Sequence, residues 1–423
     1  MNRRTVLSRL TALTAVGLLA VAPAAAAPGP KGPPVTDNPA AVLDWNAVAF
    51  RTVVTEGGQP PQVAQFYLGL VSTAVYNAVV TVEGGGTATV PQPPAKVHAS
   101  SDVAAVTAAH DVLRHYFPSS ASTLAANYRT FLASRPNGVG KVHGVFAGQD
   151  AAAALLGTRD DSELNAPITL PRPPDPPPGV WVPTGSGEMQ APWLAFVTPI
   201  VLEAGADLGI DGPDPINSVA YAVDFEEART MGAATGSLRS PQQTETGLFF
   251  TDNPPRQYQD ALRDRAARHD LDIVESARMM AAANVAGADA LIACWAAKYE
   301  ANFWRPVTAI HRADEDDNPD TAADPTWVSL RPSPPYPEYP SGHACISGGV
   351  AGALEALYGE GGVDTVVASA VTGTTRHYNS EDAWLDDVVD GRIFLGFHFR
   401  DGMEDGRQIG AETAERVVGA FLP

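Results

Sequence analysis

The sequence has little cysteine and few basic residues. Two cysteines among 423 residues are too few for a thiolate metal cluster. The 28 lysine and arginine residues are outnumbered by 48 acidic residues, so the formal net charge is −20. Nucleic acids and anionic lipid surfaces bind basic proteins, because their phosphates need positive partners, and the composition therefore argues against both as partners. A site for a small anion has to be a local exception to this acidic surface.

The two thiols are those of Cys294 and Cys345. Both lie within apolar helical patterns, which is typical of buried, unpaired cysteines. In an oxidising compartment the same residues could instead form a disulfide. The sequence leaves these two alternatives open.

Long apolar runs are also lacking, apart from one near the start of the chain. The pair Arg3-Arg4 precedes this run, residues 10–21, and four alanines follow it at residues 24–27. We therefore predict a signal peptide over residues 1–27, and the arginine pair favours the twin-arginine export route over a general secretory signal. The protein is expected to be exported, to the periplasm or beyond. No later segment is expected to reach the length of a membrane span, so no stable membrane association is expected after the signal is removed.

Alternating strand patterns are scarce, and helical periodicity dominates the chain. Between Val103 and Phe117, for example, apolar residues recur every three or four positions. After the signal peptide we predict a loose leader over residues 28–40 and a helical domain over residues 41–423. A proline-dense stretch within this domain, residues 166–192, is predicted to be an extended connector. The predicted fold class is all-α, built from helical bundles.

The longest helical pattern, residues 271–304, carries two cations near its end. Lys298 and Arg305 are seven residues apart, or two helical turns, so we expect them on one helix face, about 10.5 Å apart. Pro306 is expected to end the helix and to fix the direction of Arg305. Two such cations usually form a solvated stripe. Here their neighbours are aromatic, and the two side chains could instead converge on one anion.

A second candidate anion site is the helix start at Ser341-Gly342-His343. Ser341 occupies the position of an N-cap, and Gly342 leaves the first backbone N–H groups unobstructed, as in anion sites at helix N-termini. His343 in the first turn is then placed for proton transfer to the bound group. A capped helix with an incidental histidine is the alternative.

Arg392 and His398 form the third candidate group. The interval of six residues is not a same-face helical spacing, so they would reach a common target from different directions, and Gly396 permits a close approach. Taken alone, His398 is more often a core histidine than a ligand. The three groups together change this balance, because unpaired buried cations are costly and an anion with several oxygens is their natural partner.

Together the three groups resemble the signature shared by vanadium-dependent haloperoxidases and type 2 phosphatidic acid phosphatase-like acid phosphatases. The matching pattern is Lys298-x6-Arg305-Pro306, then Pro340-Ser341-Gly342-His343, then Arg392-x5-His398. Flanking residues, such as Phe303-Trp304 and Tyr339, look most like the haloperoxidase branch. The resemblance covers about residues 40–420 and implies two four-helix bundles, with the pocket in the second.

By this resemblance, the cofactor would be orthovanadate, and the substrates would be hydrogen peroxide, a halide and a small organic molecule. The vanadium ligand would be His398. The residues that hold the oxygens would be Lys298, Arg305, Ser341, Gly342 and Arg392. The catalytic residues would be His343, as acid and base, together with His398 and Lys298, the last of which would polarise the peroxide. Halide attack would then give hypohalous acid.

The resemblance also places two aromatic residues and reveals two departures. Trp295 and Tyr336 fall where fungal chloroperoxidases have aromatics near the halide, so they would line the halide and substrate side; ordinary packing is the alternative. Gly391 stands where the family usually has serine before the third-motif arginine. Gly402 stands where it often has aspartate, four residues after the ligand histidine. Both departures are expected to affect the orientation and basicity of His398 rather than the existence of the pocket.

The same pocket could hold phosphate, because vanadate and phosphate have nearly the same shape. His398 would then be the nucleophile of an acid phosphatase that forms a phosphohistidine, with His343 protonating the leaving alcohol. A non-catalytic oxyanion-binding relative is the third interpretation. The chain length and the flanking residues favour the haloperoxidase.

Overall fold

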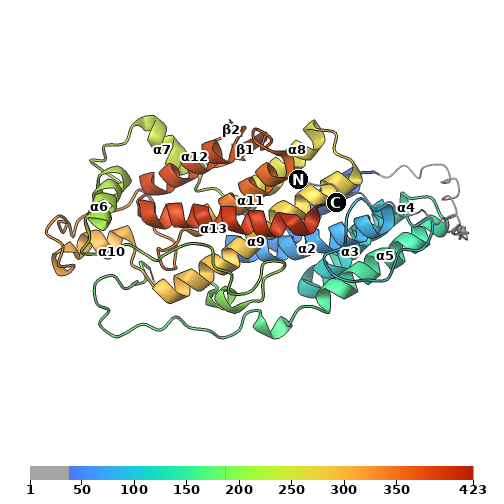
Figure 1. Ribbon diagram of the computed structural model, residues 1–423, viewed down its shortest axis with the longest axis horizontal. Coiled ribbons are helices and arrows are strands. Elements are labelled where there is room, and N and C mark those ends of the chain that lie inside the picture. The colour runs from blue at the N-terminus through green and yellow to red at the C-terminus, as the bar shows by residue number, and fades with distance from the viewer. Residues whose placement is uncertain (1–37, 186, 423) are drawn as a thin grey trace, which may run out of the picture. The chain divides into compact units, whose positions relative to one another are not determined.

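The computed structural model describes residues 38–185 and 187–422, which form helical bundles and one short hairpin (Figure 1). The predicted signal peptide, residues 1–27, and the predicted leader as far as residue 37 lie outside the described residues.

Helices supply nearly all of the regular structure. The first group is α1 (Ala40–Phe50), α2 (Pro61–Glu83), α3 (Ser101–Tyr116), α4 (Ala121–Ala133) and α5 (Val139–Leu156). The remaining helices are α6 (Val219–Gly232), α7 (Pro241–Phe249), α8 (Pro254–Arg268), α9 (Ile273–Ala301), α10 (Pro306–His311), α11 (Gly342–Tyr358), α12 (Glu381–Phe394) and α13 (Arg400–Val418). Within the described residues, the named strands are only β1 (Thr365–Ser369) and β2 (Thr374–Tyr378), which pair antiparallel. The predicted all-α fold of helical bundles is confirmed.

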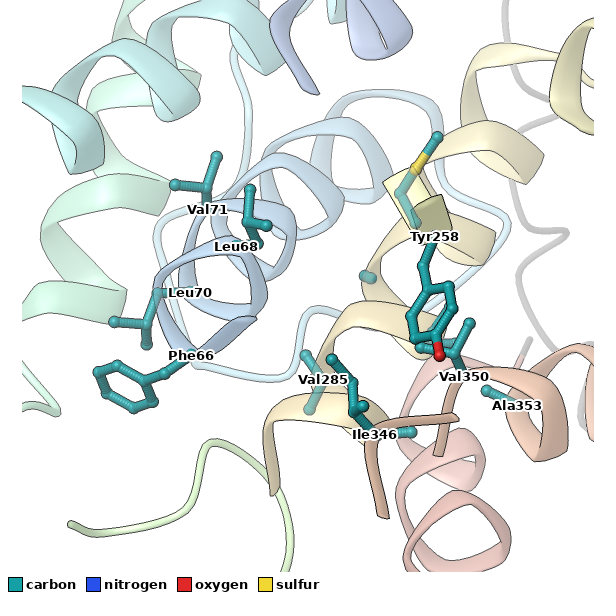
Figure 2. Packing of buried hydrophobic residues seen from close by; sticks show 14 of the residues in the cluster. Phe66, Leu68, Leu70, Val71, Tyr258, Val285, Ile346, Val350 and Ala353 are labelled. Carbon is teal, nitrogen blue, oxygen red and sulfur yellow. The ribbon is translucent and has the colours of Figure 1, made fainter. Parts of the chain in front are cut away.

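The long helix α9 joins the two groups of helices. Its start is fixed by a capping box: the Asp272 carboxylate accepts a hydrogen bond from the Glu275 amide (2.8 Å), and the Glu275 carboxylate accepts one from the Asp272 amide (3.0 Å). α9 packs against α2, α11 and α13. Figure 2 shows the apolar residues of this core, among them Phe66, Leu68, Leu70, Val71, Val285, Ile346 and Val350.

The backbones of α9, α11 and α13 approach one another closely where glycines face a neighbouring helix. A Cβ atom on Gly349 would lie 2.7 Å from the carbonyl oxygen of Ala286, and one on Gly410 would lie 2.6 Å from the Cα atom of Gly348. Ordinary carbon contacts are about 3.5–4.0 Å, so a side chain at either position requires the helices to separate.

Gly349→Ala is expected to lower the free energy of unfolding by about 1–3 kcal/mol, because the added methyl group must displace the backbone of α9. Denaturant unfolding followed by circular dichroism measures the change. Gly419→Ala is the matched control, because Gly419 is helical (φ −53°) and no described atom lies within 4 Å of its Cβ position. The control should leave stability unchanged or raise it slightly. Equal losses in the two variants would contradict the close-approach explanation.

Two core helices, α2 and α9, are long and apolar enough to cross a membrane by length and composition alone. The prediction that no later segment reaches this length is therefore wrong, because these helices are apolar around most of their circumference rather than along one stripe. Their most apolar windows are 100% and 89% buried inside the fold, as expected for core helices.

The structure separates Lys298 from Arg305. α9 ends at Ala301, and Asn302 adopts a left-handed conformation (φ 45°, ψ 42°). Arg305 is extended (φ −83°, ψ 154°), because the ring of Pro306 disfavours a helical conformation in the residue before it. The predicted common helix face is therefore wrong: the chain leaves the helix before it reaches Arg305.

The final helix also begins earlier than its apolar pattern predicts. The pattern favours a helix over about residues 406–421, whereas α13 begins at Arg400. Glycines such as Gly402 weaken the pattern, since glycine has a low helix propensity. Contacts with distant residues nevertheless hold the first turn: Arg400 pairs with Glu227 (2.7 Å), and the Gly402 carbonyl accepts a hydrogen bond from the Ser341 amide (2.7 Å).

The described residues of the proline-dense stretch, 166–185 and 187–192, run in turns and extended segments to the end of α9. Trp181 is buried, and its amide donates a hydrogen bond to the carbonyl of Asn302 (2.8 Å). The carbonyl of Gln190 accepts a hydrogen bond from the indole N–H of Trp295 (3.1 Å). The connector therefore reaches one of the predicted site residues.

Candidate functional site

A cavity of about 470 Å³ lies among the residues of the three motifs. Residues of α2, α8, α9, α11 and α12 and of three intervening segments form its wall. The predicted site residues on this wall are Trp295, Tyr336, Gly342, His343 and Arg392. The other predicted residues are fully buried in the same region: Lys298, Arg305, Ser341 and His398.

Tyr336 covers two of the buried cations. Its ring centroid lies 5.2 Å from the Lys298 ammonium nitrogen and 5.1 Å from the centre of the Arg305 guanidinium. The ring also packs against that of Trp295, with the centroids 5.1 Å apart. Because an aromatic face attracts cations, Tyr336 stabilises both charges while presenting an apolar surface to the cavity.

Lys298 holds the segment that precedes α11. Its ammonium donates hydrogen bonds to three backbone carbonyls, those of Pro337 (2.9 Å), Glu338 (2.9 Å) and Pro340. Burial is the main reason that the pKa of Lys298 is lowered to about 8. The sequence prediction directs Lys298 to the oxyanion, whereas in this structure its hydrogen bonds go to protein carbonyls.

Arg305 connects the segment before α11 to the third motif. Its Nε donates to the carbonyl of Tyr336 (3.0 Å), and its Nη1 donates to the carbonyl of Phe397 (2.8 Å) and lies 3.0 Å from Nε2 of His398. Burial lowers the pKa of this guanidinium. The structure therefore places a permanent cation directly beside the predicted ligand histidine.

Arg392 reaches the cavity from α12, where it is held by a neighbouring aromatic segment. Its Nη1 donates a hydrogen bond to the carbonyl of Phe250 (2.9 Å), and its guanidinium lies 4.7 Å from the ring centroid of Phe397. Burial, the largest effect, lowers the pKa of Arg392 to about 10. The preceding Gly391 has space for no side chain, since a Cβ atom there would lie 2.9 Å from the Phe250 ring. The departure at Gly391 is thus explained by the close packing of Phe250.

The helix start at the second motif has the predicted cap. The Ser341 hydroxyl accepts a hydrogen bond from the Ala344 amide (3.4 Å), and α11 begins at Gly342. His343 lies in the first turn, with its ring centroid 5.8 Å from that of Phe250. Burial first, and the charge of Arg392 second, lower the pKa of His343 well below 6.5, so the imidazole is neutral at neutral pH.

Glu338 is the site residue that the motifs do not reveal. Its Oε1 lies 2.7 Å from Nδ1 of His398, and both side chains are 1% exposed. Burial raises the pKa of Glu338, although Arg305 and Lys298 lower it. The available signal is that Glu338 is the one acidic residue in the proline-rich segment over 331–343.

The two thiols lie beside the site. Cys294 and Cys345 are both free and buried, which agrees with the first of the two alternatives that the sequence leaves open. The Cys294 thiol lies 3.6 Å from the carbonyl oxygen of Pro340, which Lys298 also contacts.

The site contains buried nitrogens that the protein does not satisfy. Among the described residues, the structure gives no hydrogen-bond partner to Nη2 of Arg305, Nε of Arg392 or Nε2 of His343. Leaving the two arginine donors unpaired costs free energy, because each belongs to a buried cation, and an anion with several oxygens would satisfy them. Among all the residues that the structure describes, no group of three or more His, Cys, Asp or Glu side chains is placed to hold a bare metal ion. The donor set therefore fits an oxyanion with one histidine nitrogen beside it.

Comparison with known proteins agrees with this geometry. Residues 278–421 match the family model described as the VCPO second helical-bundle domain. The resemblance to vanadium-dependent haloperoxidases is confirmed. A vanadium chloroperoxidase from Curvularia inaequalis is 25% identical over 331 residues, which cover 62% of this chain and 53% of that protein. The chain thus spans about half the length of this curated relative.

Two solved haloperoxidase structures show the same fold. A bacterial vanadium-dependent iodoperoxidase gives a TM-score of 0.76 at 20% identity, covering 92% of this chain and 98% of that one. The holo form of a bacterial vanadium-dependent chloroperoxidase gives a TM-score of 0.66 at 18% identity, covering 86% and 93% of the two chains.

The haloperoxidase-type bundle domain does not form the cavity alone. All three motifs lie within residues 278–421, which the family model matches. The cavity wall also includes Pro61 and Gln62 at the start of α2, and Phe250 after α7. Helix α2 of the first group and the segment after α7 therefore contribute to the cavity wall.

Proposed function

We propose that this protein is a vanadate-dependent haloperoxidase, which uses hydrogen peroxide to oxidise a halide to hypohalous acid or an equivalent halogenating species. The observation that carries the proposal is the set of unsatisfied buried nitrogens on Arg305, Arg392 and His343, beside the imidazole of His398. The haloperoxidase relatives support vanadate rather than another oxyanion. Bound vanadate would supply a Lewis-acidic centre that activates peroxide toward halide attack.

The proposal gives each buried group a defined task. His398 would supply the nitrogen ligand through Nε2, since Nδ1 faces Glu338. Arg305 and Arg392 would neutralise the oxygens with Nη2 and Nε respectively, the atoms without partners among the described residues. These cations are fixed by other hydrogen bonds before any ligand arrives, so little reorganisation is needed on binding.

His343 is placed to move protons at the cavity wall. Its imidazole is neutral, and Nε2 has no partner in the described part of the chain, so this nitrogen is free to accept a proton from incoming peroxide. The proton can then return to a departing oxygen. The aromatic wall formed by Phe250, Trp295 and Tyr336 limits water around these steps and leaves room for a halide and an organic acceptor.

The decisive experiment compares the two chemistries that an oxyanion pocket allows. Purified protein supplied with vanadate, hydrogen peroxide and bromide is expected to brominate a phenolic acceptor, with activity that saturates with vanadate. Without vanadate it should release little phosphate from an aryl phosphomonoester. Phosphatase activity that vanadate inhibits, with no halogenation, would establish the phosphohistidine alternative. His398→Ala is the control, because it should abolish whichever activity is present.

A further inference from the structure

Glu338 is held in position by two contacts to one oxygen of its carboxyl group. Oε1 lies 2.7 Å from Nδ1 of His398 and accepts a weaker hydrogen bond from the Phe399 amide (3.2 Å). Within the described residues, Oε2 has no hydrogen-bond partner. The segment that carries Glu338 is itself fixed, because the Lys298 ammonium binds the Glu338 carbonyl (2.9 Å). The contact with His398 is therefore supported from both the side chain and the backbone.

The carboxyl group of Glu338 occupies the space beside Gly402. A Cβ atom on Gly402 would lie 2.8 Å from both carboxyl oxygens of Glu338 and 3.1 Å from its Cδ. Gly402 is buried in the first turn of α13, and its carbonyl is bound by the Ser341 amide, so its backbone cannot move aside freely. Positions 338 and 402 therefore compete for a single volume next to His398.

We infer that Glu338 is the positioning residue of His398, and that Gly402 is glycine because the Glu338 carboxyl group fills the space of its side chain. By accepting a hydrogen bond from Nδ1–H, the Glu338 carboxyl group fixes the tautomer and ring direction of His398, which leaves the Nε2 lone pair facing Arg305 and the anion site. The inference rests on the oxyanion site of the proposed function. The inference adds that a carboxylate can reach His398 from position 338 or from position 402, but not from both at once.

The test exchanges the carboxylate between the two positions. Glu338→Ala is expected to weaken vanadate binding, measured by equilibrium dialysis, by about 10- to 100-fold. Adding Gly402→Asp to Glu338→Ala should recover most of this loss, because the aspartate side chain starts in the vacated volume. Gly402→Asp alone should weaken binding, since two carboxyl groups then crowd one space. Glu338→Gln should lose less than Glu338→Ala, because its amide oxygen can still accept from Nδ1.

A second readout needs no vanadate. Nitrogen-15 NMR of histidine-labelled protein should show His398 as the Nδ1-protonated tautomer in the wild type and in the double variant, and as a mixture in Glu338→Ala. The matched control is Glu381→Ala, which removes a partly buried carboxylate on α12 and should change neither readout.

The outcomes separate the inference from the proposed function. Unchanged vanadate affinity and tautomer in Glu338→Ala would overturn the positioning role of Glu338. A double variant that binds vanadate no more tightly than Glu338→Ala would overturn the inference that a carboxylate at position 402 can replace Glu338. A wild type that does not bind vanadate would overturn the proposed function, and the tautomer measurement would still decide the role of Glu338.

Discussion

Arg392→Met is expected to make the vanadate-free protein more stable, by about 1–2 kcal/mol, while weakening vanadate binding about 100-fold. Arg392 is a buried cation whose Nε has no partner among the described residues, so the fold bears the cost of its desolvation. Replacing a buried, incompletely paired charge with an apolar side chain of similar length often stabilises a protein. The same change removes a charged hydrogen bond to the anion, worth about 1.5–3 kcal/mol.

Thermal unfolding with and without vanadate measures both effects in one protein sample. The matched control is Arg265→Met. Arg265 is also buried, but its Nε and Nη2 bind the carbonyls of Val363 (3.1 Å) and Gly362 (2.6 Å) outside the site. Removing Arg265 leaves two carbonyls unpaired, whereas Arg392→Met leaves only that of Phe250 unpaired, so the control should lose stability and keep its vanadate affinity. Destabilisation in both variants would show that Arg392 serves the fold rather than an anion.

His343→Gln is expected to lower kcat for halogenation by about 10²- to 10⁴-fold, the range for loss of a general acid–base group. Its effect on vanadate affinity should be less than about tenfold, because only one neutral hydrogen bond is lost. Steady-state kinetics at saturating vanadate separate the two quantities. A variant that binds vanadate poorly but retains kcat would assign His343 to anion binding instead.

His343 should also make stability depend on pH. Its pKa is lowered in the folded protein by burial and by Arg392, from an ordinary value of 6.5. Below pH 6.5 the unfolded chain therefore binds a proton that the folded protein excludes. Stability should fall as pH is lowered through this range, by up to about 1.4 kcal/mol per pH unit for one proton. Denaturant unfolding at a series of pH values should show a shallower dependence in His343→Gln than in the wild type.

Local chemistry explains what the sequence could predict about the site. The Ser341 cap and the start of α11 follow from residues next to one another in the chain, and the structure shows both. The chain turns before Arg305 because Pro306 constrains it, an effect that simple helical spacing from Lys298 ignores. The motifs nevertheless identify side chains that the fold brings into one region. Their distances and directions do not follow from the motifs, because they depend on how the helices pack.

Partners from distant parts of the sequence explain what could not be predicted. Glu338 meets His398 across 60 residues, and Arg392 is held by the carbonyl of Phe250 across 142. Neither contact follows from periodicity. The unusual Gly391 is likewise understood only once the Phe250 ring is seen against it. The residue type at a position that departs from the family pattern is thus explained by spatial neighbours that cannot be identified from the sequence.

The three carbonyls gathered around the Lys298 ammonium resemble the oxygen cage of a bound potassium or sodium ion, with a covalently attached cation at its centre. Removing that cation would leave three oxygen dipoles pointing at one another, and their repulsion would displace both the cap of α11 and the carboxylate that faces His398. Activity lost on substitution of Lys298 would therefore not show that this lysine touches peroxide. A single substitution of Lys298 removes both its positive charge and the hydrogen bonds that hold the three carbonyls in place.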